Sequence, residues 1–133
     1  MNDYPEHEKQ IKAIEKEHEK ILRDFKTWLT EKGLSSTTIE KHCFNINFFI
    51  NAFLLHYETK KASEGTDAVS MFLGFWFIRK AMWSSESRIR SNVASLKKFY
   101  QFVVERGEVS PDKYAQMRMV IKEELPTWIE TVN

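Results

Sequence analysis

The stretch of residues 83–107, WSSESRIRSNVASLKKFYQFVVERG, has the features of one complete helix and constrains the fold more than any other part of the chain. Ser84 or Ser85 can accept a backbone N–H as the N-cap, and Gly107 can adopt the left-handed conformation that ends many helices. Apolar residues recur between them at spacings of three and four, at Ile89, Val93, Leu96, Tyr100 and Val103. The pattern predicts a helix with one apolar side that packs against other helices.

This stretch also holds the chain's excess positive charge. Residues 79–106 contain seven Lys or Arg and two Glu, a net charge of +5, whereas the whole chain carries +1. Because residues three and four apart are neighbours on a helix surface, two exposed polar rows are expected. The first row contains Arg88, Ser91, Ser95 and Lys98, and the second contains Arg90 and Lys97. The sequence therefore predicts a basic helix face.

The rest of the chain also favours helices. Four Gly and three Pro, without alternation of apolar and polar residues, favour an all-α fold. Five helices are predicted. The first is capped by Asn2 or Asp3 and stops at Gly33, the second runs from a cap at residues 35–38 to about His56, and the third runs from Asp67 to about Met82. The fourth is the 83–107 stretch, and the fifth begins at Ser110 and Pro111, runs to about Leu125 and is ended by Pro126. Residues 57–66 are expected to form a loop. Together these elements predict a compact bundle of four to five helices.

The second and third predicted helices are apolar over a wide surface. The inward stripe of the second helix is expected to contain Ile39, Cys43, Ile46, Ile50, Phe53 and Leu54. Three further aromatic residues widen this apolar surface: Phe44, Phe48 and Phe49. The polar side is expected to contain Lys41, His42 and Asn45. The third is apolar nearly all round. It is expected to be buried within the monomer, with coverage by a second subunit as the alternative.

Composition excludes several classes of protein. The chain has 133 residues, which favours one domain, and its 42% hydrophobic and 14% aromatic content argues against disorder. The single cysteine, Cys43, excludes an internal disulfide and is expected to be buried and unreactive. Residues 1–20 are too charged for a secretory signal, and the most apolar run, residues 69–78, is too short to cross a bilayer. We expect a cytoplasmic protein without membrane contact.

Two segments, in order, resemble a known family. The first resembles the pattern F..WL..KGLS..TI........F..F through Phe25, Trp28, Leu29, Lys32, Gly33, Leu34, Ser35, Thr38, Ile39, Phe48 and Phe53. The second resembles S..TI...L..L+.FY.FL...G.I through Ser85, Ile89, Leu96, Phe99, Tyr100, Phe102, Val103, Val104, Gly107 and Val109. Both patterns are those of the N-terminal core-binding domain of tyrosine recombinases, or phage integrases. The resemblance implies a SAM-like helical bundle over residues 21–125, with a charged helical extension at 1–20 and a tail at 126–133 that resembles an interdomain linker.

The resemblance implies double-stranded DNA as the partner, because this domain is half of a clamp on duplex DNA and presents its second and fourth helices to it. Lys and Arg neutralise phosphates, Ser and Thr hydroxyls near a helix start add short contacts, and Arg88 or Arg90 can read guanine. The matching DNA-binding candidates are Ser36, Thr38, Lys41 and His42 on the second helix, and Ser85, Ser87, Arg88, Arg90, Ser91, Lys97 and Lys98 on the fourth. The predicted role is DNA binding in integration or recombination.

Catalysis is not expected. The catalytic domain of the family has no counterpart in this sequence, and Tyr4, Tyr57, Tyr100 and Tyr114 lie in predicted helical-domain sequence. No glycine-rich phosphate loop, HExxH or GxSxG motif is present. The four histidines lack a compact metal spacing, although His7 and His18, eleven apart, fall on roughly one helix face. We therefore expect no enzyme activity, no cofactor and no metal.

Two alternatives remain. The chain can be a protein-interaction module descended from such a domain, forming a homodimer or binding a recombinase through the third helix or the tail around Trp128, as an accessory or inhibitor. It can also be a fragment of a longer integrase. The initial Met1 and the absence of a tag favour a complete reading frame.

Overall fold

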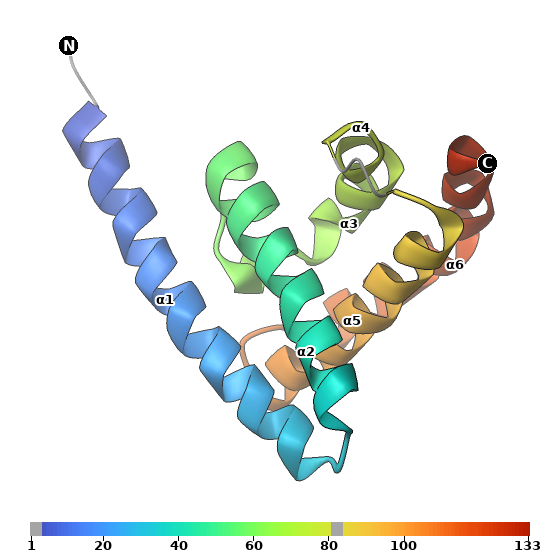
Figure 1. The fold of residues 1–133 in the computed structure, drawn as a ribbon. Helices are drawn as coiled ribbons and strands as arrows, with labels where there is room; N and C mark the ends of the chain where they lie inside the picture. Colours follow the sequence, from blue (N-terminus) through green and yellow to red (C-terminus); the bar gives the residue numbers. More distant parts are fainter. Residues whose placement is uncertain (1–3, 81–83) are drawn as a thin grey trace. The chain divides into compact units, whose positions relative to one another are not determined.

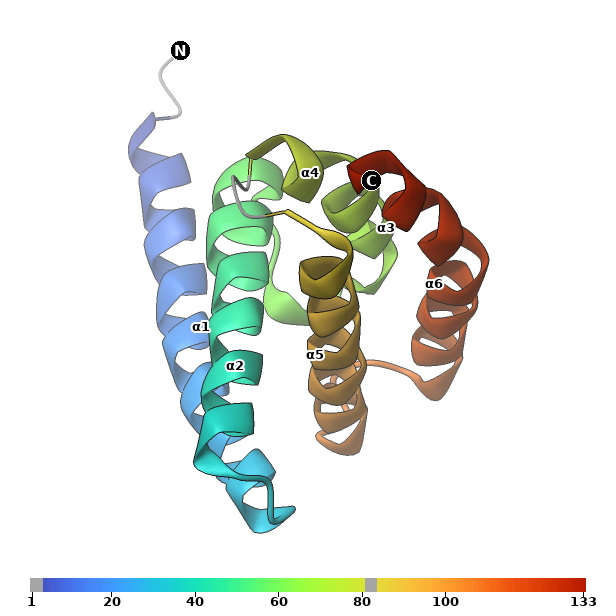
Figure 2. The ribbon, with the colours of Figure 1, turned by 45° about the vertical axis from the view of Figure 1, so that its right-hand side comes forward.

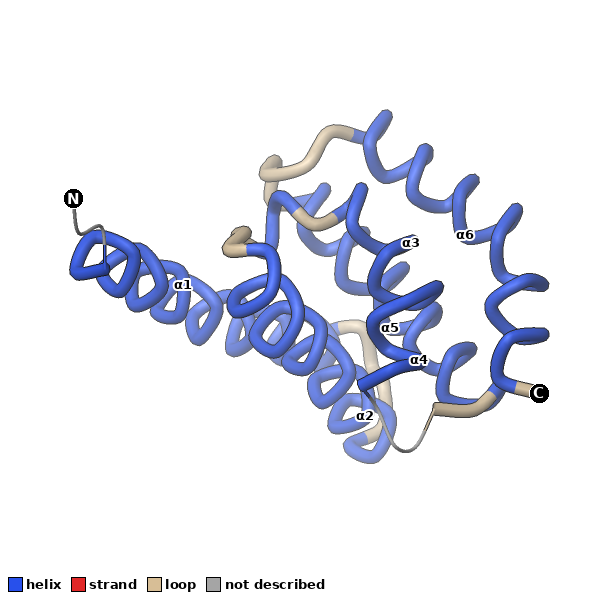
Figure 3. Tube along the Cα trace, turned by 90° about the horizontal axis from the view of Figure 1, so that it is seen from above, coloured by secondary structure: helices blue, strands red, loops and turns tan. Residues whose placement is uncertain are grey.

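A computed structural model describes residues 4–80 and 84–133 (Figure 1). The described residues form helices joined by loops and contain no strand, which confirms the all-α prediction (Figure 3). Five long helical segments are present in the described part, interrupted or extended by π and 3-10 turns. They are α1 (Tyr4–Glu31); α2 (Ser36–Asn47) continued by η1 (Phe48–Glu58); α3 (Val69–Met71), η4 (Phe72–Trp76) and α4 (Phe77–Lys80); α5 (Glu86–Glu105); and α6 (Pro111–Val132). The predicted caps at Asn2 or Asp3 and the predicted helix end at Met82 lie outside the described residues.

The chain divides into two compact units, unit 1 (residues 1–62) and unit 2 (residues 63–133). These bounds differ from the ranges that the family resemblance implies, which are residues 1–20, 21–125 and 126–133. The implied ranges stay a prediction. The charged extension expected at residues 1–20 is continuous with the following helix, because α1 runs to Glu31 without a break.

Unit 1 consists of α1 packed along α2 and η1 (Figure 2). Gly33, at φ 82°, ends α1: its N–H donates to Thr30 O, and Leu34 N–H donates to Leu29 O. This Schellman pattern satisfies the last carbonyls of the helix. Ser35 then caps α2 by accepting the N–H of Thr38. Both predicted boundaries are confirmed.

The core of unit 1 is rich in aromatic rings. From α1 come Ile14, Ile21, Phe25 and Leu29, and from α2 and η1 come Ile39, Ile46, Phe49, Ile50, Phe53, Leu54 and Leu55. Phe53 stacks on Phe49 and on Tyr57, with ring centroids 6.0 and 5.6 Å apart. The helix runs on to Glu58, two residues past the expected end at His56, and Thr59 ends it in the left-handed conformation (φ 54°).

Several side chains of α2 lie differently from the prediction. Phe44 is 56% exposed and Cys43 is half-buried, so neither lies fully in the core. His42 (7% exposed) and Asn45 are buried instead of lying on a polar face. Hydrophobicity alone assigned these faces wrongly, because the face a helix buries is set by where its neighbours pack.

In unit 2, α6 packs against α5 and against η3 (Thr66–Ala68), α3 and η4. Ser85, not Ser84, is the N-cap of α5, and Ser110 caps α6 with Pro111 at the start. The predicted stop at Gly107 is confirmed: its φ is 79°, and Glu108 N–H donates to Val103 O at 3.2 Å.

The third helical segment begins and packs differently from the prediction. Asp67 lies inside η3 and does not cap α3, and part of the predicted loop is helical, in η2 (Ala62–Glu64) and η3. Val69, Phe72, Leu73, Trp76 and Phe77 are buried, as expected for burial within the monomer. Met71 and Phe75, four residues apart, are 44% and 46% exposed. The segment thus has one solvent-facing apolar row.

Pro126 does not end the last helix, contrary to the prediction. It lies inside α6, which continues to Val132 although proline cannot donate the usual backbone hydrogen bond. Tertiary contacts hold the helix on both sides of it: before the proline, Ser70 Oγ donates to Glu124 Oε1 at 2.5 Å, and after it Trp128, which is 3% exposed, packs against Gly74. The predicted tail is therefore a docked part of unit 2.

Candidate nucleic-acid interface

The predicted DNA-binding residues of the fourth helix lie on α5, which separates an apolar side from a polar side. Ile89, Leu96 and Val103 are fully buried, and Val93 and Tyr100 are also buried, which confirms the predicted apolar stripe. The opposite side, called here the outer face of α5, consists of exposed or half-buried residues three and four apart. It contains Ser87, Arg90, Ser91, Ala94, Lys97, Lys98 and Gln101.

The outer face differs from the rows expected from the sequence. Ser95 is 0% exposed, so the predicted row of Arg88, Ser91, Ser95 and Lys98 is wrong. Arg88 shares its row with Asn92 and Ser95, both buried, and Asn92 Nδ2 donates to Arg88 O at 2.9 Å. The Arg88 side chain is exposed because it lies in the first turn of the helix. Arg88 therefore flanks the N-terminal end of α5 and is not part of its outer face.

Ala94 lies at the centre of the outer face. It is four residues from both Arg90 and Lys98, and three from both Ser91 and Lys97. Its methyl group is the smallest side chain on this face, so the longer cationic side chains surround a low centre, which is a shallow depression over Ala94. Gln101 extends the row Arg90, Ala94, Lys97 by one further turn. Neither Ala94 nor Gln101 was a sequence candidate, although their spacing from Arg90 was visible in the sequence.

Several cations of residues 79–106 have partners within the described structure. Arg90 Nε lies 3.0 Å from Glu86 Oε2, and this hydrogen bond is the main cause that lowers the pKa of Glu86. Arg106 pairs with Glu108 at 2.7 Å, and the Arg79 guanidinium lies 4.3 Å from the centroid of the Phe75 ring.

The remaining cations of α5 are Arg88, Lys97 and Lys98. Their side chains make no ion pair within the described residues. These three side chains are therefore the cations of α5 that can pair with an external anion without first leaving a carboxylate.

Two of the α5 candidates also have structural roles. Ser85 Oγ accepts the N–H of Arg88 at 3.2 Å as the helix cap, which leaves its hydroxyl proton available. Lys97 contributes its carbonyl oxygen to Tyr114 Oη of α6 at 3.1 Å. Burial raises the pKa of Tyr114. This bond fixes α6 to α5 through the backbone of Lys97, so it does not use the Lys97 ammonium group.

The four candidates on α2 belong to unit 1. Ser36 and Lys41 are exposed, Thr38 is half-buried and accepts a hydrogen bond from Ser35 Oγ at 3.0 Å, and His42 is buried. Ser36 and Lys41 are therefore the members of this group with the most accessible side chains. The α2 candidates belong to unit 1 and the α5 candidates to unit 2, so they form two separate surfaces, one on each unit.

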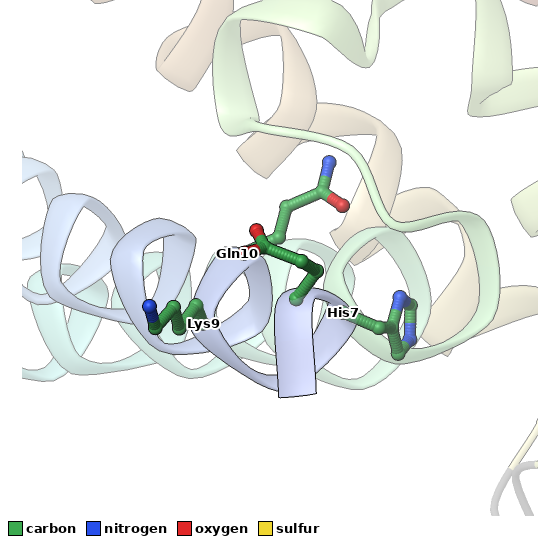
Figure 4. A pocket seen from close by; sticks show the side chains of 4 residues that line it. His7, Lys9 and Gln10 are labelled. Atoms are coloured by element: carbon green, nitrogen blue, oxygen red, sulfur yellow. The ribbon is translucent and has the colours of Figure 1, made fainter. Parts of the chain in front are cut away.

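Other site types find no support in the described residues. No group of three or more His, Cys, Asp or Glu can hold a metal ion there, and no described helix is long and apolar enough to span a membrane. A shallow hollow beside the first turns of α1 is lined by Glu6, His7, Lys9 and Gln10. Its labelled side chains point in different directions from one helix (Figure 4). They form no convergent site.

No family model, no curated protein and no solved structure matches this chain. The resemblance to the core-binding domain of tyrosine recombinases thus depends on the two sequence patterns.

Proposed function

We propose that this protein binds double-stranded DNA without catalysing a reaction on it, through the outer face of α5 together with Arg88. The observation that carries this proposal is the arrangement of Arg90, Lys97 and Lys98 around Ala94. A low centre lets the helix approach a groove closely, and cations at its margins then reach phosphates on either side. The family resemblance adds a role in DNA integration or recombination.

The number of available cations sets the expected strength of binding. Arg88, Lys97 and Lys98 can each neutralise one phosphate, so the logarithm of the binding constant should fall with the logarithm of salt with a slope of about −3. Affinity of this sequence-independent kind lies at about 10⁻⁴ to 10⁻⁶ M at physiological salt. Gln101 can pair with adenine, and Arg90 can pair with guanine once it leaves Glu86. Lys41 and Ser36 of unit 1 are proposed as additional phosphate contacts.

Fluorescence anisotropy with a labelled duplex of about 30 base pairs tests this proposal. The variant Lys97→Ala/Lys98→Ala is expected to bind about tenfold more weakly at low salt and to reduce the salt slope by about 2. Lys113→Ala/Lys122→Ala is the matched control, because it removes the same charge from exposed positions of α6 in the same unit. Its affinity should stay within about threefold of the wild type.

Two results contradict the proposal. Equal losses in the two double variants would mean that only net charge matters and that α5 is not the contact surface. Absence of binding at low salt, with the helical circular dichroism spectrum intact, would exclude DNA as a partner of this chain.

A protein-interaction module is the second candidate. The exposed row of Met71 and Phe75 in unit 2 favours it, because two large apolar side chains on one face are a common feature of helix-helix contacts. Molecular mass measured by analytical ultracentrifugation over a concentration series distinguishes self-association from a monomer. If the row is a dimer contact, Met71→Ser/Phe75→Ser shifts the chain to the monomer.

A further inference from the structure

His18 forms a junction inside unit 1 that DNA binding by α5 does not explain. It lies in the middle of α1 and is 1% exposed. Its Nδ1 lies 2.8 Å from Oδ1 of Asn51 in η1, and its Nε2 lies 3.0 Å from the backbone nitrogen of Ala62. The ring therefore joins α1 to η1 and to residues 59–62, the segment by which the chain leaves unit 1.

The Ala62 contact fixes the protonation state of the ring. A backbone N–H can only donate, so Nε2 of His18 presents its lone pair and carries no proton. The proton of the neutral ring then lies on Nδ1 and is donated to Oδ1 of Asn51. Asn51 Nδ2 in turn donates to Oδ1 of Asn47 at 2.7 Å, which holds the amide in the accepting orientation. The whole set of hydrogen bonds requires a neutral His18.

We propose that His18 is a pH-sensitive latch, which holds residues 59–62 against α1 when neutral and releases them when protonated. A proton on Nε2 would face the N–H of Ala62, so the hydrogen bond is lost and two donors oppose each other. Within this segment, Lys60 N–H also donates to Leu54 O at 2.9 Å, which ties residue 60 to η1 and not to α1. Thr59 is also left-handed (φ 54°), a conformation that a non-glycine residue keeps only when its surroundings hold it.

The groups around His18 determine where it titrates. On α1, Glu17 favours the protonated ring, but its carboxylate also lies 3.7 Å from Lys61 Nζ. Glu58 at the end of η1 lies 3.7 Å from Lys60 Nζ, and the Asn51 side chain that faces the ring is uncharged. Burial lowers the pKa of His18 below its ordinary value of 6.5, with the Asn51 hydrogen bond and Glu17 acting in the opposite direction. Release is therefore expected on the acid side of pH 6.5.

Nuclear magnetic resonance of the ¹⁵N-labelled full chain tests the latch. The ring nitrogens of His18 should show the Nδ1–H tautomer at neutral pH. The protection factor of the Ala62 amide, corrected for intrinsic exchange, should fall by up to about tenfold per pH unit between pH 6.5 and the folded-state pKa. The Ile21 amide in the same helix should keep its protection. A pH-independent Ala62 amide, or a parallel loss at Ile21, would overturn the proposal.

Variants separate His18 from the other histidines. His18→Gln keeps a neutral acceptor for Ala62, so its Ala62 protection should not depend on pH, whereas exposed His7→Gln and His56→Gln should behave as the wild type. Should His18→Gln not fold, Asn51→Asp serves instead, because a carboxylate beside Nδ1 favours the protonated ring. This variant should move the midpoint of the His18 ring titration, followed through the ring nitrogens, to higher pH by about one unit. An unchanged midpoint in this variant contradicts the latch.

Discussion

Replacement of Gly74 in η4 by alanine should destabilise the protein while Trp128 is present and stabilise it once Trp128 is replaced. A Cβ atom at this position would lie 2.7 Å from Nε1 and 3.1 Å from Cδ1 of Trp128. Alanine gains about 1 kcal/mol over glycine in a helix interior. Overpacking of a filled site costs about 1–3 kcal/mol, and the 3% exposed indole has little room to move. With an overlap this close, we expect Gly74→Ala to lower the free energy of unfolding by about 1–2 kcal/mol.

Removal of the indole should reverse this effect. Trp128→Leu alone destabilises the protein by about 2–4 kcal/mol through lost packing. In that background Gly74→Ala no longer meets the ring, so it should stabilise by up to about 1 kcal/mol. Urea unfolding followed by far-ultraviolet circular dichroism gives the four free energies of the cycle. If Gly74→Ala stabilises the wild type, or has the same effect in both backgrounds, then Trp128 does not pack on Gly74 as described.

Three further predictions concern helix ends and pH. Ser85→Ala should cost about 1 kcal/mol in thermal unfolding through loss of the α5 cap, whereas Ser84→Ala should cost less than about 0.5 kcal/mol, and equal costs would contradict the cap assignment. Gly107→Ala should cost about 1–2 kcal/mol in urea unfolding, because φ is 79° with no neighbour within 4 Å of the added methyl group, so an unchanged midpoint would refute the strain argument. The lowered pKa of His18 means that the unfolded chain binds its proton first, so this contribution to stability is complete above pH 6.5 and is lost as pH falls through the folded-state pKa. Plots of the free energy of unfolding against pH should therefore run parallel for the wild type and His18→Gln above pH 6.5. Below pH 6.5 the wild type should lose stability faster than the variant, and parallel plots there would contradict this role of His18.

Local chemistry explains which structural features were predictable from the sequence. Ser35, Ser85 and Ser110 act as caps and Gly33 and Gly107 act as stops because these roles depend on the residue and its immediate backbone. The apolar side of α5 was predictable for the same reason, since its period is that of the helix.

Tertiary packing decided the features that were predicted wrongly. Ser95 and His42 are polar but buried, and Phe44 is apolar but exposed, because the packing of neighbouring segments selects the covered face. Pro126 should end a helix by its own chemistry, but the docking of Trp128 holds α6 beyond it. No local pattern contains the distant contact with Gly74.

The latch residue was partly visible in the sequence. The sequence spacing places His7 and His18 on roughly one face of a helix, but His7 is exposed whereas His18 is buried. Its spacing from Ile14 and Ile21, four and three residues, places it on the apolar row of α1. A histidine on such a row must find partners inside the protein, but Asn51 and Ala62 lie 33 and 44 residues further along the chain.

The ion pair between Glu86 and Arg90 gives the outer face of α5 a built-in competitor. A carboxylate already occupies the guanidinium at 3.0 Å, so an incoming anion must outcompete it. A single carboxylate on an acidic protein offers Arg90 no more than Glu86 already does. If the chain binds DNA as proposed, a strand presents several phosphates at once, so it can displace Glu86 while Lys97 and Lys98 hold neighbouring charges. Glu86 would thereby tune this surface to closely spaced negative charge, and Glu86→Gln should weaken that preference by letting isolated anions bind.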